Sequence, residues 1–205
     1  KHSFSFANYY NPKKMGFGAL RVLNDDVIAP SKGFDTHPHK DMEIITIITK
    51  GELMHQDDTG SKAVLRPGEV QVMSAGSGIM HSERNNSSDE DLELFQLWIT
   101  PDTQGVEPRH EEKNYTLEKN KLTVLAGEGG IPLHQDARVI LIDIDKDYTH
   151  KPKESSYVMI VEGAVQIKGE RMGERDAIAI SDEKEISINP QEEAKLLIID
   201  VPMKK

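Results

Sequence analysis

The sequence predicts an all-β protein made of two related β-domains. Short runs of apolar and β-branched residues recur along the 205-residue chain and are separated by turn-forming residues, which is the pattern expected of strands. No long segment repeats its apolar residues with the 3.6-residue period of an amphipathic helix. In addition, an arrangement of strand, glycine turn, second strand and further turn runs from Ile47 to Glu69 and again from Met159 to Ile178.

Ten segments have the composition and length of strands, four to eight residues each. They are residues 19–23, 43–49, 70–73, 92–99, 121–125, 139–144, 157–161, 177–180, 185–188 and 195–201. Clusters of Asn, Asp, Ser, Pro and Gly predict turns between them, for example at residues 24–26 and 66–68, because these residues favour turn conformations.

The repeated arrangement of strand, glycine turn and second strand predicts two domains, residues 1–115 and 116–205. Residues 101–120 are polar and contain proline, glycine and several charges, so we expect them to form the connection. A chain of this length is compatible with two compact domains.

Composition limits the chemistry that the chain can perform. There is no cysteine, which excludes disulfides, thiolate nucleophiles, iron–sulfur clusters and cysteine-based zinc sites. Any metal would therefore be held by His, Asp and Glu. The net charge of −10 argues against direct nucleic-acid binding, which needs clustered Lys and Arg.

Targeting signals are missing from the sequence as well. No run approaches ~18 apolar residues, so we expect no membrane span, and no secretory signal is visible, so we expect a cytoplasmic protein. The first residue is Lys1 rather than Met, which leaves open whether the natural start is missing.

Two short segments carry ligand-type side chains at strand spacing. His37 and His39 are separated by one residue, as are His81 and Glu83, and residues i and i+2 of a strand point to the same face. Pro38 restricts His37 to an extended conformation. If these strands are neighbours in a barrel, three imidazoles and one carboxylate converge.

Such a donor set suits Fe(II), Mn, Ni, Cu or Zn and leaves coordination positions open. The alternative interpretation is two unrelated strands whose histidines make ordinary hydrogen bonds.

The residues around these histidines resemble the two cupin motifs. The first is Gly33-x3-His37-x-His39-x3-Glu43-x7-Gly51, and the second is Gly68-x5-Ser74-x-Gly76-x4-His81-x3-Asn85. The second has Ser74 where proline is usual and a longer gap between glycine and histidine. These departures are similar to the pirin branch of the cupins, nearest to bacterial pirin-like quercetinases, as are the strings FSFANYY, THPHKDMEI, HQDDTGS, MSAGSGIMHSE and LFQLWI.

The resemblance implies a bicupin of two jelly-roll β-barrels in which the N-terminal barrel binds one divalent metal ion. The implied ligands are His37, His39, His81 and Glu83. Fe(II) is the implied metal, with Zn, Mn, Ni, Cu and Cd as alternatives. Glu43 fills the carboxylate position of the general cupin motif, but pirins use the later Glu, so we expect Glu43 to support the site by hydrogen bonding.

Other histidines leave their roles open. His55 lies in the HQDD segment and is either a residue of the pocket or a structural histidine. In the second domain only His134 and His150 are present, and they are far apart in the sequence. We therefore expect the C-terminal barrel to be metal-free, which matches the pattern of the resemblance.

The activity that the resemblance implies is cleavage of a flavonol such as quercetin by O2 with release of CO. A divalent ion would lower the pKa of the flavonol 3-hydroxyl, and Glu83 is the expected base, with Glu43 or a metal-bound water as alternatives. Apolar side chains would line the mouth or, alternatively, pack in the core: Phe34, Met73, Ile79 and Met80.

A second hypothesis is a non-enzymatic, metal-dependent and redox-responsive pirin that acts on a protein partner. A third, a cupin sugar epimerase or isomerase, fits less well because those enzymes need no set of three His and one Glu. The resemblance implies a monomer.

Overall fold

The structure is a computed structural model that describes residues 1–5, 11–12 and 14–203. Every regular element in these residues is a β-strand, which confirms the all-β prediction. Most of the FSFANYY string, residues 6–10, lies outside the described part. Within the described part, no helix has the length and apolarity needed to cross a membrane.

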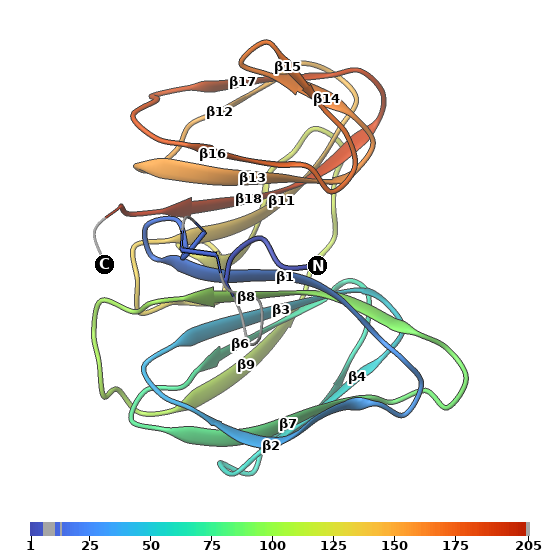
Figure 1. The fold of residues 1–205 in the computed structure, drawn as a ribbon, viewed down its shortest axis with the longest axis vertical. Helices are drawn as coiled ribbons and strands as arrows, with labels where there is room; N and C mark the ends of the chain where they lie inside the picture. Colours follow the sequence, from blue (N-terminus) through green and yellow to red (C-terminus); the bar gives the residue numbers. More distant parts are fainter. Residues whose placement is uncertain (6–10, 13, 204–205) are drawn as a thin grey trace. The chain divides into compact units, whose positions relative to one another are not determined.

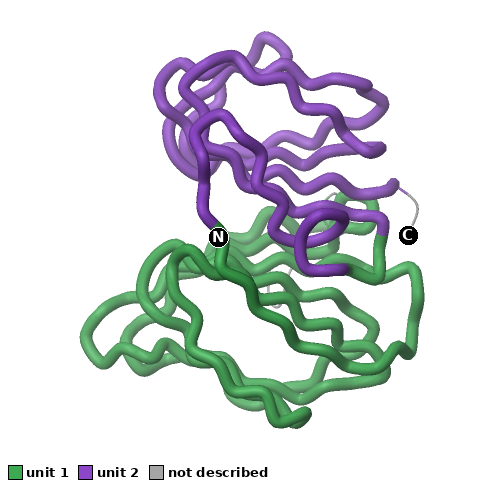
Figure 2. Tube along the Cα trace, turned by 180° about the vertical axis from the view of Figure 1, so that it is seen from behind, with its two compact units in different colours: residues 1–115, 133–135 green, residues 116–132, 136–205 purple. Residues whose placement is uncertain are grey.

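The chain divides into two compact units (Figure 2). Unit 1 contains residues 1–115 and 133–135, and unit 2 contains residues 116–132 and 136–205. A short piece of chain around His134 thus belongs to unit 1, although it follows the start of unit 2 in sequence.

Unit 1 consists of two antiparallel sheets (Figure 1). The five-stranded sheet has the order β1-β8-β3-β6-β9; its strands are β1 (Leu20–Ile28), β3 (Glu43–Lys50), β6 (Glu69–Ser74), β8 (Leu92–Ile99) and β9 (Arg109–Asn114). The four-stranded sheet has the order β2-β7-β4-β5; its strands are β2 (Gly33–His39), β4 (Leu53–Asp57), β5 (Lys62–Leu65) and β7 (Ile79–Asn85).

Unit 2 repeats this arrangement. Its five-stranded sheet has the order β10-β11-β18-β13-β16; its strands are β10 (Thr123–Gly127), β11 (Arg138–Ile144), β13 (Ser155–Glu162), β16 (Ala177–Ile180) and β18 (Ala194–Val201). Its four-stranded sheet has the order β12-β17-β14-β15; its strands are β12 (Tyr148–His150), β14 (Val165–Ile167), β15 (Glu170–Met172) and β17 (Ile186–Pro190).

All ten segments predicted as strands overlap strands of the structure, but two local predictions were wrong. The expected turn at Asn24–Asp26 lies inside β1, because that part of β1 pairs residue by residue with β8 and Asn24 is buried. The expected connection, residues 101–120, contains β9, which pairs with β6 at the edge of the sheet. Strand pairing outweighs local turn propensity and polarity in both places.

The interior of unit 1 contains polar side chains between apolar clusters. On β3, Ile44 and Ile48 belong to two different clusters, and Thr46 lies between them on the same face. The cross-strand neighbours of Thr46 are Gln96 on β8 and Gln71 on β6, and all three are buried. The inside of this unit is therefore built to receive polar groups.

The interior of unit 2 is apolar apart from buried polar residues around Asp200, Ser156 and His150. Inward-facing positions of β11 and β18 are occupied by Ile140, Ile142, Ile144, Leu196 and Ile198, which join one large cluster. This difference between the two interiors places the candidate site in unit 1.

Candidate metal centre

The pairing of β2 with β7 brings three histidines together. His37 lies opposite His81 in the register, and His39 lies opposite Ile79. One ligand nitrogen from each of His37, His39 and His81 lies within 4.8 Å of the others. The Nε2 atoms of His37 and His81 are 3.0 Å apart. The i, i+2 spacing therefore produces the convergence that the sequence predicts.

A β-bulge helps to aim these side chains. Phe34 lies opposite Glu83 and His37 opposite His81, so β2 contains one more residue than β7 over this stretch. A bulge changes which face the following side chains occupy. The extra residue lies between Phe34 and His37, immediately before the two histidines.

A backbone carbonyl sets the tautomer of His37. Its Nδ1 lies 2.7 Å from the carbonyl oxygen of Asp35, and a carbonyl can only accept, so Nδ1 carries the proton. The lone pair of the neutral ring is then on Nε2, the atom that faces His81. Metal-binding histidines are commonly oriented in this way by a hydrogen bond from the second ring nitrogen.

Burial keeps two of the three imidazoles neutral. Burial, with the nearby charges of His37, His39 and His55, lowers the pKa of His81 to about 3. Burial and the charge of His37 lower the pKa of His39 to about 4. Neutral imidazole is the form that binds a metal ion, so both rings are ready to act as ligands at neutral pH.

Glu83 lies beside the three histidines but outside the group whose ligand atoms are mutually within 4.8 Å. It shares the inward face of β7 with His81 and is buried. Its Oε2 accepts a hydrogen bond from Gln96 Nε2 at 2.7 Å, and its Oε1 has no partner among the described residues. Burial raises the pKa of this carboxyl to about 7, although the hydrogen bond from Gln96 opposes the increase.

A second group of ligand-type residues lies in the same unit. His55 and Asp57 of β4 and His110 of β9 each offer a ligand atom, and these atoms lie within 4.8 Å of one another. Burial and the charge of His110 lower the pKa of His55 to about 4. His55 was considered in the sequence as an isolated residue, and His110 fell in the expected connection. The His-x-Asp and His-x-Glu spacings at residues 55–57 and 110–112 were the available signal.

Comparisons with known proteins identify the family. A family model described as Pirin matches residues 1–99, and one described as quercetinase C-terminal cupin domain matches residues 125–201. The chain is 44% identical over 208 residues to an Escherichia coli protein named quercetin 2,3-dioxygenase, an alignment that covers 98% of this chain and 90% of that protein. The chain belongs to the pirin family.

Further relatives agree with this assignment. A Caulobacter vibrioides protein named pirin-like protein is 41% identical over 211 residues, with coverage of 98% of this chain and 90% of that protein. The crystal structure of the bacterial pirin YhhW from Escherichia coli in complex with nickel(II) matches with a TM-score of 0.93 and 42% identity, covering 98% of this chain and 90% of that one. The bicupin fold is therefore confirmed for this pirin.

Glu43 does not lie with the histidines of this pirin. Strand alternation places it on the face of β3 opposite to Thr46. There its Oε2 accepts hydrogen bonds from Ser74 Oγ at 2.8 Å and from the backbone N–H of His134 at 3.4 Å. Burial raises the pKa of this carboxyl. The expected supporting or basic role of Glu43 at the centre therefore has no geometric basis.

The four apolar side chains considered for a pocket mouth have different places. Ile79 and Met73 are buried in one apolar cluster with Ile44, so they pack in the core. Met80 is exposed on the opposite face of β7 from His81. Phe34 is 45% exposed, and its ring approaches the ring of His37 edge-on, with centroids 6.5 Å apart. Only Phe34 combines exposure with contact to the centre.

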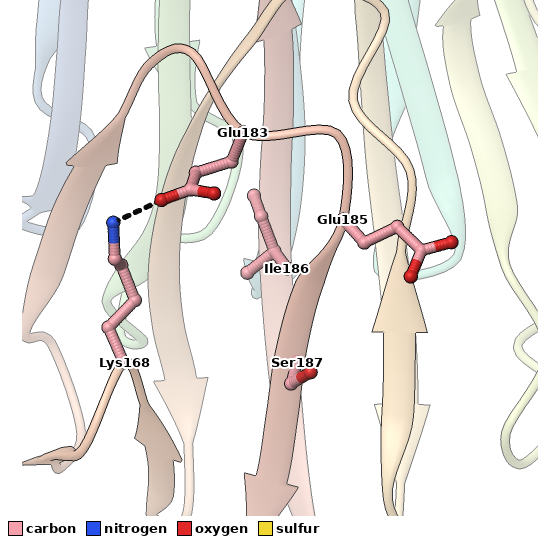
Figure 3. A pocket seen from close by; sticks show the side chains of 5 residues that line it. All are labelled: Lys168, Glu183, Glu185, Ile186 and Ser187. Atoms are coloured by element: carbon pink, nitrogen blue, oxygen red, sulfur yellow. Dashed lines mark hydrogen bonds and ion pairs between the residues drawn. The ribbon is translucent and has the colours of Figure 1, made fainter.

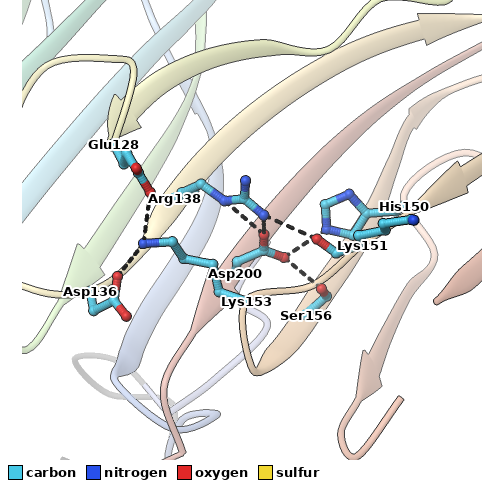
Figure 4. A network of polar contacts seen from close by, with 8 residues as sticks. All are labelled: Glu128, Asp136, Arg138, His150, Lys151, Lys153, Ser156 and Asp200. Atoms are coloured by element: carbon cyan, nitrogen blue, oxygen red, sulfur yellow. Dashed lines mark hydrogen bonds and ion pairs between the residues drawn. The ribbon is translucent and has the colours of Figure 1, made fainter. Parts of the chain in front are cut away.

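Unit 2 holds a buried polar network around Asp200 (Figure 4). The Oδ1 atom of Asp200 accepts hydrogen bonds from His150 Nε2 at 2.8 Å and Ser156 Oγ at 2.6 Å. Its Oδ2 atom accepts one from Arg138 Nε at 3.1 Å. Both carboxylate oxygens are thus occupied by protein donors. We interpret this network as structural.

One pocket of unit 2 is lined by Lys168, Glu183, Glu185, Ile186 and Ser187 (Figure 3). Lys168 Nζ and Glu183 Oε1 are 2.6 Å apart at one side of the pocket, and Glu185 points away from this pair. The cation and anion neutralise each other, so the pocket presents no convergent set of groups for chemistry.

Proposed function

We propose that this pirin is a metal-dependent dioxygenase that cleaves flavonols such as quercetin with O2 and releases CO. The observation that carries the proposal is the convergence of His37, His39 and His81 within 4.8 Å, in a chain 44% identical to a protein named quercetin 2,3-dioxygenase. The substrates are a small aromatic molecule and O2. In the reaction both atoms of O2 are added to the aromatic molecule, and one of its carbons leaves as CO.

We further propose that His37, His39, His81 and Glu83 hold one divalent ion at this centre, with Fe(II) as the native metal. The tautomer of His37 and the partnerless Oε1 of Glu83 fit such an ion. Nitrogen and oxygen donors of this kind bind several divalent metals, and availability decides among them. When bound, the ion would act as a Lewis acid that stabilises the deprotonated flavonol.

Protein groups around this centre offer a base for the 3-hydroxyl proton and an apolar contact for the aromatic substrate. Glu83 is the proposed acceptor of the 3-hydroxyl proton: burial raises its pKa to about 7 when no ion is bound, and a general base is most effective when its pKa is close to the working pH. Gln96 donates a hydrogen bond to Oε2, so Oε1 is the oxygen left open, and it serves either the ion or the proton at any one time. The exposed ring of Phe34 offers the aromatic substrate an apolar contact beside His37.

The test is to measure metal content, quercetin-dependent O2 uptake and CO release for the wild type, His81→Ala and His134→Ala. His134 makes backbone hydrogen bonds to Glu43 and Asp102 and lies outside the group of three histidines, so His134→Ala is the matched control and should keep both metal and turnover. We expect His81→Ala to lose turnover and one metal ion relative to the wild type.

Two outcomes would count against these proposals. If the metal-loaded wild type neither consumes O2 nor releases CO, the enzymatic proposal fails and the alternative of a metal-binding interaction protein takes its place. If His81→Ala turns over quercetin without that metal ion, the assignment of the ligands is wrong.

A further inference from the structure

Strands β4 and β9 repeat the ligand pattern of the first centre. His55 and Asp57 are two residues apart on β4, and His110 and Glu112 are two residues apart on β9. The strands belong to different sheets of unit 1, yet ligand atoms of His55, Asp57 and His110 lie within 4.8 Å of one another. Glu112 Oε1 lies 3.9 Å from His110 Nδ1.

The buried atoms of this group lack partners. His55 is 0% exposed, and neither of its ring nitrogens has a hydrogen-bond partner among the residues that the structure describes. Buried polar side chains in proteins are nearly always bonded, and a ring without any polar partner loses its hydration without compensation. This histidine therefore needs a ligand that the surrounding side chains do not supply.

Hydrogen bonds hold one oxygen of the Asp57 carboxylate, and the other oxygen remains available. Its Oδ1 accepts hydrogen bonds from Thr59 N at 3.0 Å, Thr59 Oγ1 at 2.6 Å and Ser61 N at 3.1 Å. Its Oδ2 is buried and has no hydrogen-bond partner in the described part of the chain. The turn after β4 thus holds this carboxylate in place and leaves one oxygen for another group.

The tautomer of His110 makes its second nitrogen a ligand atom. Its Nε2 lies 2.9 Å from Gln71 Oε1, so Nε2 carries the proton and donates a hydrogen bond to the amide oxygen. Nδ1 then has a lone pair on the side of the Glu112 carboxylate. A lone pair and a carboxylate repel each other unless a cation lies near both.

We propose that His55, Asp57, His110 and Glu112 form a second divalent-cation site in unit 1, separate from the centre at His37, His39 and His81. Two imidazoles with carboxylates suit a borderline ion such as Zn²⁺. The rings of His55 and His110 are stacked, with centroids 4.5 Å apart and planes at 5°, so at least one ring turns when the ion binds.

The two sites are close neighbours. The ring centroids of His55 and His81 are 5.3 Å apart, and Asp57 lies opposite His81 in the register of β4 and β7. Two divalent ions in adjacent sites repel each other. An ion at the His55 site therefore binds more weakly while the centre at His37, His39 and His81 is occupied. Removing the ion from that centre should raise the affinity of the His55 site.

The test is to count Zn²⁺ bound by the full chain, by calorimetric titration and by metal analysis after desalting. His110→Phe keeps a ring beside His55 and removes both nitrogens, and β9 is an edge strand, so the fold should tolerate it. His39→Ala disables only the first centre. Glu111→Gln, on the other face of β9 in an ion pair with Arg109, is the control for Glu112→Gln.

We expect two Zn²⁺ per chain for the wild type and Glu111→Gln, one for His110→Phe and one for His39→Ala. Glu112→Gln should weaken the second ion about tenfold or more, since outer carboxylates commonly contribute 10–100-fold in affinity. The proposal is overturned if the wild type binds only one Zn²⁺, or if folded His110→Phe keeps two. None of these outcomes depends on turnover of quercetin.

Discussion

Gln96 donates a hydrogen bond from Nε2 to Oε2 of Glu83 over 2.7 Å, and its own Oε1 accepts one from Trp98 Nε1 at 3.2 Å. The ring of Trp98 packs edge-on against His39, with centroids 4.8 Å apart. Gln96 on β8 therefore connects two of the proposed metal ligands, which lie on the other sheet of unit 1. Its place between them suggests that it sets the orientation of the Glu83 carboxylate.

Replacing Gln96 by Met should weaken metal binding at the first centre. Met has a similar length but donates no hydrogen bond, so the Glu83 carboxylate loses the group that holds Oε2. We expect a 10–100-fold loss of affinity for the divalent ion, the range found when a partner of a metal ligand is removed. Competition with a chelator measures this affinity. An unchanged affinity would show that Gln96 does not position Glu83.

Gly33 is required where β2 meets β7. A Cβ at this position would lie 2.1 Å from the carbonyl oxygen of Glu83 and 2.6 Å from Cα of Arg84. Because these are backbone atoms, Gly33→Ala should push the two strands apart and cost about 1–3 kcal/mol of unfolding free energy or more. It should also reduce metal retention, since both strands carry proposed ligands.

Gly173→Ala is the matched control for this substitution. Its nearest neighbour would be Asp176 Oδ2 at 4.0 Å, which is ordinary contact. Urea unfolding of both variants measures the difference. Equal stabilities of the two variants would contradict the steric argument for Gly33.

Phe34→Ala should raise the KM for quercetin if the protein is the proposed dioxygenase. Contacts between aromatic rings contribute about 0.5–1.5 kcal/mol, so we expect an increase of up to about tenfold with unchanged metal content. Met80→Ala is the control, because Met80 is similarly exposed but lies on the other face of β7. Equal KM values for the two variants would remove Phe34 from the substrate contact.

The sequence was sufficient to predict those parts of the site and fold that depend on the spacing of nearby residues. His37 and His39 were predictable as a pair on one face because alternation along a strand depends only on residue number, and the resemblance to the cupin motifs added His81. The strand-like runs come from local β-branched composition. The side of β3 on which Glu43 lies was not predictable, because it depends on which face of that strand turns inward. That choice follows from the packing of both sheets.

The second histidine group was missed for a similar reason. β9 contains no apolar alternation, and four of its six residues are exposed, so nothing local distinguishes it from a polar connection. Only its pairing with β6 brings His110 near His55. A polar edge strand of this kind can be recognised only when the strand that it pairs with is known.

Asp200→Asn should destabilise the protein strongly and in a pH-dependent manner. Burial alone would raise the pKa of Asp200, but the hydrogen bonds and charge of His150, Ser156 and Arg138 lower it below its usual value. Removing one partner of a buried charged network costs about 3–5 kcal/mol, and here an amide would also place N–H groups against donors. We therefore expect this loss of unfolding free energy at neutral pH.

The pH dependence follows from the direction of that shift. A carboxyl whose folded pKa lies below its unfolded pKa stabilises the fold above the unfolded value, about 3.9 for Asp. This contribution disappears as the pH falls through the lower folded pKa. The difference between wild type and Asp200→Asn should therefore shrink below about pH 4.

Urea unfolding at several pH values measures this difference for the variant and for Glu162→Gln. Glu162 pairs with Lys195 at 2.9 Å in the same sheet, but its side chain is 62% exposed, so solvent screens the pair and its loss should change stability little. A difference between wild type and Asp200→Asn that grows as the pH falls below 4 would have the wrong sign. It would mean that Asp200 is protonated more readily in the folded protein than in the unfolded chain.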